Sequence, residues 1–147
     1  KEKQREIVDS VMSAFKFYSQ YYYDGRISSD YVIFFSNWQT QIFSLFLRIL
    51  ASMQNVPAER MKIAEYVLDL QRDVLNTDTF RSNLNRNGSR YYEVSTVEVA
   101  CGLESLADGL SVAYSVKEVE VARQICVGIE NAMIFLNKVQ NGSDLKR

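Results

Sequence analysis

Helical periodicity constrains this chain more than any other feature of its sequence. Apolar residues recur at steps of three and four positions almost throughout, and no segment alternates with the period of two that a half-buried strand shows. The pattern predicts an all-α fold of about five helices: one helix over residues 2–23, an antiparallel helical hairpin over 29–76 and a second hairpin over 95–140. The polar segment 77–94 is long for a connection inside a compact domain, and we expect a loop there.

Apolar stripes indicate which face of each helix is buried. In the third helix the stripe consists of Ile63, Val67, Leu70 and Val74. In the second helix it consists of Val32, Phe35, Gln39, Ile42, Phe46, Ile49 and Met53.

Two capping boxes predict where the last two helices begin. Ser95 with Glu98 three residues later has the spacing of such a box, and Ser115 with Glu118 repeats it. The hydrophobic staple that accompanies the second box would consist of Tyr114 and Val119.

The charge is nearly balanced, and histidine is absent. The 147 residues carry 17 Lys plus Arg against 18 Asp plus Glu, so no whole-protein field would attract nucleic acid. Without imidazoles the chain lacks His-activated nucleophiles and His-ligated metal centres, and it has no glycine-rich phosphate loop. We therefore expect no metal, no other cofactor and no nucleic-acid partner, and any chemistry would rest on carboxylates.

The longest apolar run, 42–51, is interrupted by Ser44 and Arg48 and is far shorter than the ~20 residues that cross a bilayer, so we expect no membrane span. Cys101 and Cys126 form no CxxC pair. We expect two small buried thiols, with a disulfide as the alternative. Nothing in the sequence indicates a compartment.

Two helices end alike, which indicates an internal repeat. Residues 66–71 and 135–140 share one pattern, in which an aromatic residue (Tyr66 or Phe135) is followed by an aliphatic residue and, after three further positions, by Gln (Gln71 or Gln140). Such Gln-terminated hairpins predict an array in which similar helix pairs follow one another.

These hairpins, together with the segments 92–96 (Tyr-Glu-Val-Ser-Thr) and 37–41 (Asn-Trp-Gln-Thr-Gln), resemble the (α/α) toroid superfamily. That superfamily includes six-hairpin glycosidases, N-acylglucosamine-epimerase-like enzymes and terpenoid-cyclase-like domains. The resemblance covers most of residues 11–141. It implies a partial toroid or helical-repeat array, because closed toroids of this kind contain more hairpins than this chain offers.

Carboxylates are the candidate catalytic groups, since glycoside cleavage uses two carboxyl groups that flank one bond. Glu93, Glu98, Glu104 and Asp108 lie around the start of the fourth helix, and Glu104 and Asp108 share a face at an i, i+4 spacing. Each has a non-catalytic alternative: Glu98 can serve as the third residue of the capping box, and Glu104 can be an ordinary solvated charge. The resemblance to six-hairpin glycosidases, which use acidic residues at the ends of inner helices, implies Glu93 and Glu98 as the catalytic pair.

Aromatic and arginine side chains are the candidate ligand contacts. Trp38 offers a flat face for stacking on a sugar or a protein, with packing against further helices as the alternative. Arg81, Arg86 and Arg90 precede Tyr92 in the predicted loop, and arginine forks suit carboxylate, sulfate or phosphate groups. The alternative for these arginines is a solvated loop without a ligand.

Two functions are compatible with these features. The first is a segment of a carbohydrate-active protein, a glycoside hydrolase or sugar epimerase. The second is a non-catalytic helical-repeat scaffold that self-associates or binds a protein partner through its aromatic surface. For the toroid resemblance, the odd number of helices indicates a fragment of a longer chain, a divergent open array or a chain that a partner copy completes.

Overall fold

The computed structural model describes residues 2–22, 29–77, 80 and 96–140, with the side chains of 21, 22, 29–31 and 138–140 left aside. This part of the chain contains five α-helices and no strand, which confirms the all-α prediction. The helices are α1 (Glu2–Tyr22), α2 (Ser29–Ala51), α3 (Pro57–Leu75), α4 (Thr96–Ser115) and α5 (Val119–Gln140).

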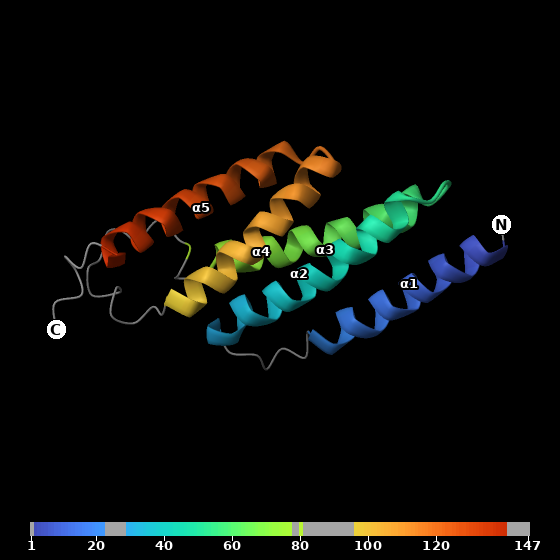
Figure 1. Ribbon diagram of the computed structural model, residues 1–147, viewed down its shortest axis with the longest axis horizontal. Helices are drawn as coiled ribbons and strands as arrows, with labels where there is room; N and C mark the ends of the chain where they lie inside the picture. The colour runs from blue at the N-terminus through green and yellow to red at the C-terminus, as the bar shows by residue number, and fades with distance from the viewer. Residues whose placement is uncertain (1, 23–28, 78–79, 81–95, 141–147) are drawn as a thin grey trace.

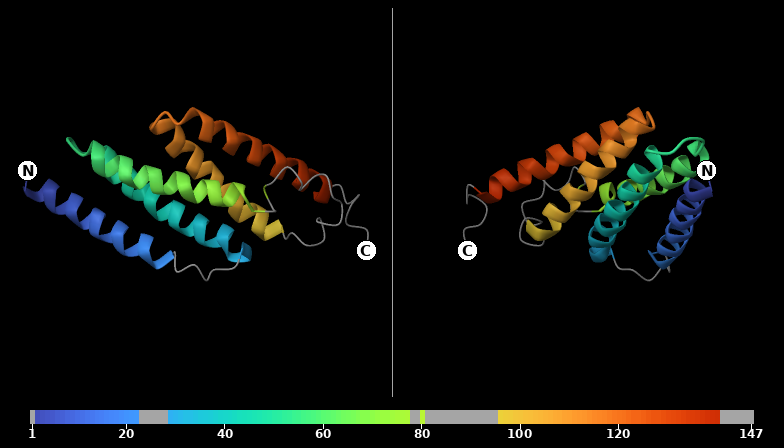
Figure 2. Two further views of the ribbon diagram at one scale, coloured as in Figure 1. Left: turned by 180° about the vertical axis from the view of Figure 1, so that it is seen from behind. Right: turned by 45° about the vertical axis from the view of Figure 1, so that its right-hand side comes forward.

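The helices alternate in direction along the chain. α2 and α4 run one way, and α1, α3 and α5 run the other way (Figure 1). The most extensive contact joins α2 and α4, two helices that are parallel and not consecutive. The antiparallel pairs α2–α3 and α4–α5 come next, while α1 and α5 lie on opposite sides of the central helices (Figure 2). A side-by-side pair of alternate helices therefore forms the centre of the fold.

The helix ends follow local chemistry, with one correction to the sequence prediction. Pro57 stands at the first turn of α3, where its missing N–H costs no helical hydrogen bond. α4 extends through Ser115, whose hydroxyl donates to the carbonyl of Val112 at 2.7 Å. Lys117 then adopts a left-handed φ of 62°, and the N–H of Glu118 donates to the carbonyl of Ala113 at 2.9 Å. The backbone bond from Glu118 to Ala113, together with the left-handed Lys117, is a Schellman ending of α4. Ser115 therefore closes α4 and does not cap α5, so the predicted capping box at Ser115 is wrong.

The staple predicted with that box is also absent, because Tyr114 and Val119 are 67% and 77% exposed. The first box cannot be compared in the same way, since Ser95 lies outside the described residues. Both cysteines are free thiols, and Cys126 is exposed, contrary to the expected burial.

The core lies where α2, α3 and α4 meet. The stripe predicted for α3, from Ile63 to Val74, is fully buried. On α2 the predicted stripe is only partly right, because Phe35 is exposed and Phe43 is buried instead. The buried positions of α2 are Ile33, Ser36, Gln39, Thr40, Phe43 and Leu50. The reason is that α2 contacts α1, α3 and α4 together, so its inner surface includes small polar residues that hydropathy alone does not mark.

Three polar side chains connect the central helices inside the core, and we call them the buried triad: Thr40 on α2, Gln71 on α3 and Ser105 on α4. The Gln71 amide nitrogen donates to Thr40 Oγ1 at 2.9 Å and lies 3.3 Å from Ser105 Oγ, while the two hydroxyls are 3.4 Å apart. Gly109 of α4 makes room for this arrangement, since a Cβ there would overlap the Gln71 side chain. The buried triad fixes the register of all three helices.

A second set of contacts attaches α1. Phe15 packs edge-on against Phe43 of α2 and Tyr66 of α3, with ring centroids 5.1 and 5.6 Å apart. Gln39 donates from its amide nitrogen to the carbonyl of Tyr18 at 2.9 Å, and Tyr66 lies with its hydroxyl 3.1 Å from the Gln39 amide oxygen. The C-terminal half of α1 is thereby held against both α2 and α3.

Candidate functional site

Most of the residues predicted to bind or catalyse lie outside the described residues. This applies to Glu93, Tyr92, Arg81, Arg86 and Arg90, whose roles stay predictions. Trp38 and Glu98 are described, and each lies away from the main pocket of the central helices.

Glu98 lies in the first turn of α4 and is partly exposed. It precedes Asp108 by ten positions, which corresponds to about 15 Å along a helix axis. The two carboxylates therefore belong to different parts of α4, and Glu98 is separate from the pocket described next.

Trp38 lies on the side of α2 that faces α1. Its ring packs edge-on against Tyr18, with centroids 5.8 Å apart, and the side chain remains 43% exposed. The indole thus has a free surface, but the contact with Tyr18 turns it away from α4.

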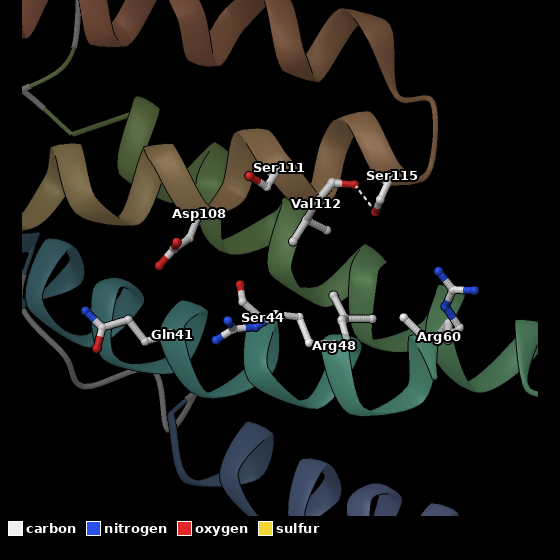
Figure 3. Close-up of a pocket in the computed structure, with 10 residues that line it drawn as sticks. Gln41, Ser44, Arg48, Arg60, Asp108, Ser111, Val112 and Ser115 are labelled. Atoms are coloured by element: carbon white, nitrogen blue, oxygen red, sulfur yellow. Dashed lines mark hydrogen bonds between the residues drawn. The ribbon is translucent and has the colours of Figure 1, made fainter. Parts of the chain in front are cut away.

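The pocket lies along the contact between α2 and α4, and we call it the α2–α4 groove (Figure 3). Its volume is about 530 Å³, within the range of ligand pockets. It is lined by Gln41, Ser44, Leu47, Arg48 and Ala51 of α2, Arg60 of α3, and Asp108, Ser111, Val112 and Ser115 of α4. The apolar lining residues are Leu47, Ala51 and Val112, and the other lining residues are polar or charged.

Asp108 is the acidic group of the groove. Figure 3 shows its carboxylate pointing from α4 toward α2, where Gln41, Ser44 and Arg48 lie. Burial raises the pKa of Asp108 above the ordinary value of an aspartate, the neighbouring Glu104 raises it further, and Arg48 lowers it. The balance is a carboxyl group that holds its proton to higher pH than usual, which is a common property of acid–base residues.

Glu104 lies beside the groove one helical turn before Asp108. It accepts hydrogen bonds from the side-chain amides of two α2 residues, Gln41 and, at 3.5 Å, Asn37. The Gln41 amide nitrogen also donates to the Asn37 amide oxygen at 3.2 Å, so the side chains of Asn37, Gln41 and Glu104 form one cluster across the two helices. Glu104 is therefore oriented by α2, whereas Asp108 faces the open groove.

Several polar groups of the groove lack partners in the described part of the chain. Neither Arg48 nor Arg60 forms a salt bridge with another described residue. The Ser44 hydroxyl is buried and has no hydrogen-bond partner. A buried hydroxyl without a partner is costly, so a ligand that reached it would gain a hydrogen bond there.

The sequence held two signals for this groove. Ser44 and Arg48 interrupt the apolar run of the second helix at an i, i+4 spacing, and Glu104 and Asp108 have the same spacing on the fourth helix. The sequence shows that the two members of each pair share a helix face. Whether the two pairs face one another depends on the register of α2 against α4, which the sequence pattern does not contain.

Comparisons of the chain with protein-family models, with curated proteins and with solved structures gave no match. Within the described residues no group of three or more His, Cys, Asp or Glu side chains could hold a metal ion. None of the described helices is long and apolar enough to cross a membrane. The geometry of the α2–α4 groove therefore carries the functional argument.

Proposed function

We propose that this chain is a segment of a carbohydrate-active protein of the (α/α) toroid kind, and that a saccharide binds in the α2–α4 groove. The parallel contact of α2 with α4, with the antiparallel α3 and α5 beside them, supports a repeat of helical hairpins. In such a repeat the alternate helices line up, and their shared surface is where a ligand would contact several hairpins.

The observation that carries the proposal is the pair of carboxylates on α4 that face polar groups of α2. Asp108 lies opposite Gln41, Ser44 and Arg48, and Glu104 accepts from Gln41. Sugar hydroxyls both donate and accept hydrogen bonds, so carboxylate, amide and hydroxyl groups can hold them together. The apolar lining residues Leu47, Ala51 and Val112 suit the C–H faces of a sugar ring.

If the protein cleaves or isomerises its saccharide, Asp108 is the candidate general acid. Glycoside hydrolysis requires a carboxylic acid of raised pKa to protonate the leaving oxygen, and a second carboxylate nearby. Glu104 would provide that second group, because it lies close enough to raise the pKa of Asp108. Glu93 and Glu98 stay alternative carboxylates from the sequence argument.

The test is a titration of the ¹⁵N-labelled chain with a panel of neutral and acidic oligosaccharides, followed by amide NMR. We expect at least one saccharide to shift amides of residues 41–51 and 108–115. Asp108→Asn and Glu104→Gln should weaken that binding about tenfold or more, as expected for the loss of charged hydrogen bonds. Asp73→Asn is the matched control, because burial also raises the pKa of Asp73, on α3, but it does not line the groove.

Turnover of the same saccharides, measured as release of new reducing ends, tests the catalytic part separately. Loss of a general acid lowers rates by about 10²- to 10⁴-fold, so Asp108→Asn should abolish detectable cleavage. If no saccharide in the panel shifts the groove amides, the proposed function is wrong.

A scaffold function is the second candidate, and a different surface favours it. Phe34, Trp38 and Leu45 lie on one side of α2 and are 40%, 43% and 47% exposed. Large exposed apolar side chains that share a face indicate an interaction surface. A scaffold would self-associate in light-scattering experiments, and the double change Trp38→Glu and Leu45→Glu would return it to a monomer.

A further inference from the structure

We propose that the ligand of the α2–α4 groove is an anionic saccharide, whose carboxylate groups bind Arg48 at one end of the groove and Arg60 at the other. This inference rests on the proposed carbohydrate function and names its substrate class. It depends on the positions of the two arginines, on the charges around them and on the shape of the groove.

The two guanidinium groups lie at opposite ends of the groove. Figure 3 shows the Arg48 guanidinium turned toward Gln41 and Asp108, and the Arg60 guanidinium near Ser115. The groove is long, because its wall on α2 runs from Gln41 to Ala51, which corresponds to about 15 Å along a helix axis. An elongated ligand with an anionic group at each end matches a groove with one arginine at each end, whereas one small anion could contact only one end.

The groove carries a surplus of positive charge, although Arg48 interacts electrostatically with Asp108. Asp108 is the acidic residue that lines it, and no salt bridge joins Asp108 to Arg48 or Arg60. Glu104 lies beside the groove, but the amides of Asn37 and Gln41 occupy its carboxylate oxygens. Two cations thus face one carboxyl group across a partly enclosed space.

Arginine is the side chain that matches planar carboxylates best, because its fork donates two parallel hydrogen bonds. A neutral sugar would need no such groups, since Asp108, Gln41 and the hydroxyls of Ser44 and Ser111 already supply donors and acceptors. The arginines therefore distinguish an acidic saccharide from a neutral one of the same shape.

The experiment compares tetragalacturonate with its methyl ester, which keeps the sugar backbone and removes the charges. Amide NMR titrations of the ¹⁵N-labelled chain should show that the acid binds at residues 41–51 and 108–115. The ester should bind at least about tenfold more weakly than the acid, as expected when a charged hydrogen bond is lost. Arg48→Gln and Arg60→Gln should each reduce affinity for the acid by a similar factor and leave affinity for the ester unchanged.

Arg123→Gln is the matched control. Arg123 is an exposed arginine of α5 that pairs with Glu120 at 2.7 Å and does not line the groove, so its loss should not change binding of the acid. Dispersed amide spectra of all three variants will show that each one is folded.

The outcomes separate this inference from the proposed function. Equal affinity for acid and ester, or unchanged affinity for the acid in both Arg48→Gln and Arg60→Gln, overturns the anionic ligand and leaves a neutral saccharide site in place. Absence of binding by any saccharide, acidic or neutral, overturns both proposals. If inorganic phosphate displaces tetragalacturonate at equal concentration, the arginines bind a free anion and the saccharide assignment is wrong.

Discussion

Two polar clusters join α2 and α4, and they differ in how many hydrogen bonds their side chains form within the protein. The buried triad of Thr40, Gln71 and Ser105 lies inside the core, and its members hydrogen-bond to one another through the Gln71 amide nitrogen and the two hydroxyls, while the Gln71 amide oxygen has no partner among the described residues. In the α2–α4 groove, by contrast, Ser44 and Arg48 face a cavity and find no partner among the described residues. Both clusters contain serine, and both bridge α2 and α4.

The difference shows which polar residues hold the fold and which are available for function. A buried polar group stabilises a protein when its partner is another part of the protein, and it costs free energy when no partner exists. The buried triad should therefore dominate stability, whereas the groove residues should contribute little to it or oppose it. Variants in the two clusters test this contrast directly.

Gln71→Ala should have the largest effect. The change removes a fully buried side chain and leaves the hydroxyls of Thr40 and Ser105 with only each other, so we expect a loss of about 3 kcal/mol in the free energy of unfolding. Urea denaturation followed by circular dichroism measures it. Gln54→Ala, at an exposed glutamine beyond α2, should change stability by less than about 0.5 kcal/mol. A small effect at Gln71 would mean that the buried triad does not fix the helix register.

Gly109→Ala should cost about 1 kcal/mol. A methyl group there would overlap the Gln71 side chain, and the overpacking outweighs the gain in helix propensity. In the Gln71→Ala background the same substitution should be neutral or stabilising, because the side chain that it would overlap is gone. A double-mutant cycle by denaturation supplies the measurement, and additive effects would contradict the close contact.

Ser105→Ala and Ser44→Ala compare one serine from each cluster. Both gain the same helix propensity, so their difference reports the hydroxyl environment. Ser105→Ala should be less stable than Ser44→Ala by about 1 kcal/mol, because only Ser105 loses hydrogen bonds within the protein. Equal stabilities of the two variants in thermal denaturation would remove the distinction between the clusters.

Asp108→Asn should have the smallest effect on stability, and the effect should be favourable at neutral pH. The pKa of Asp108 is raised in the folded state, so the native protein binds more protons than the unfolded chain in the window just above the ordinary pKa of an aspartate. The wild-type protein is thus relatively most stable below that window and loses this stability as the pH rises through it. The charged groups that act on Asp108 are Glu104, which raises its pKa, and Arg48, which lowers it.

The variant should therefore be more stable than the wild type at pH 7, with the difference shrinking toward pH 4 and below. Melting temperatures across this pH range test it. Asp73→Asn should show the same direction, because burial alone raises the pKa of Asp73. A wild-type protein that is stabilised by rising pH relative to Asp108→Asn would contradict the assigned shift.

The helices could be predicted from periodicity because their apolar positions follow local sequence. Ile63, Val67, Leu70 and Val74 were identified correctly, since α3 lies between other helices and buries one continuous stripe. On α2 the same reasoning misplaced Phe35, because contacts with three helices also bury Ser36 and Thr40, which the predicted stripe omits. Hydropathy does not report such polar contacts between helices.

The candidate site was predictable only in its parts. The i, i+4 spacing of Glu104 and Asp108 showed that they share a face, but it could not show that Arg48 and Ser44 lie opposite. That arrangement depends on how α2 and α4 align, which the buried triad sets through Gln71 of α3. Contacts between residues that are distant in sequence create the groove, so no local pattern could reveal it.

The most direct test of the account measures stability and saccharide affinity on the same variant, Asp108→Asn. The account predicts a protein at pH 7 that is at least as stable as the wild type and that binds tetragalacturonate about tenfold more weakly, whereas Asp73→Asn binds with the affinity of the wild type. A variant that loses stability and binds the saccharide unchanged would show that Asp108 supports the fold and not a ligand.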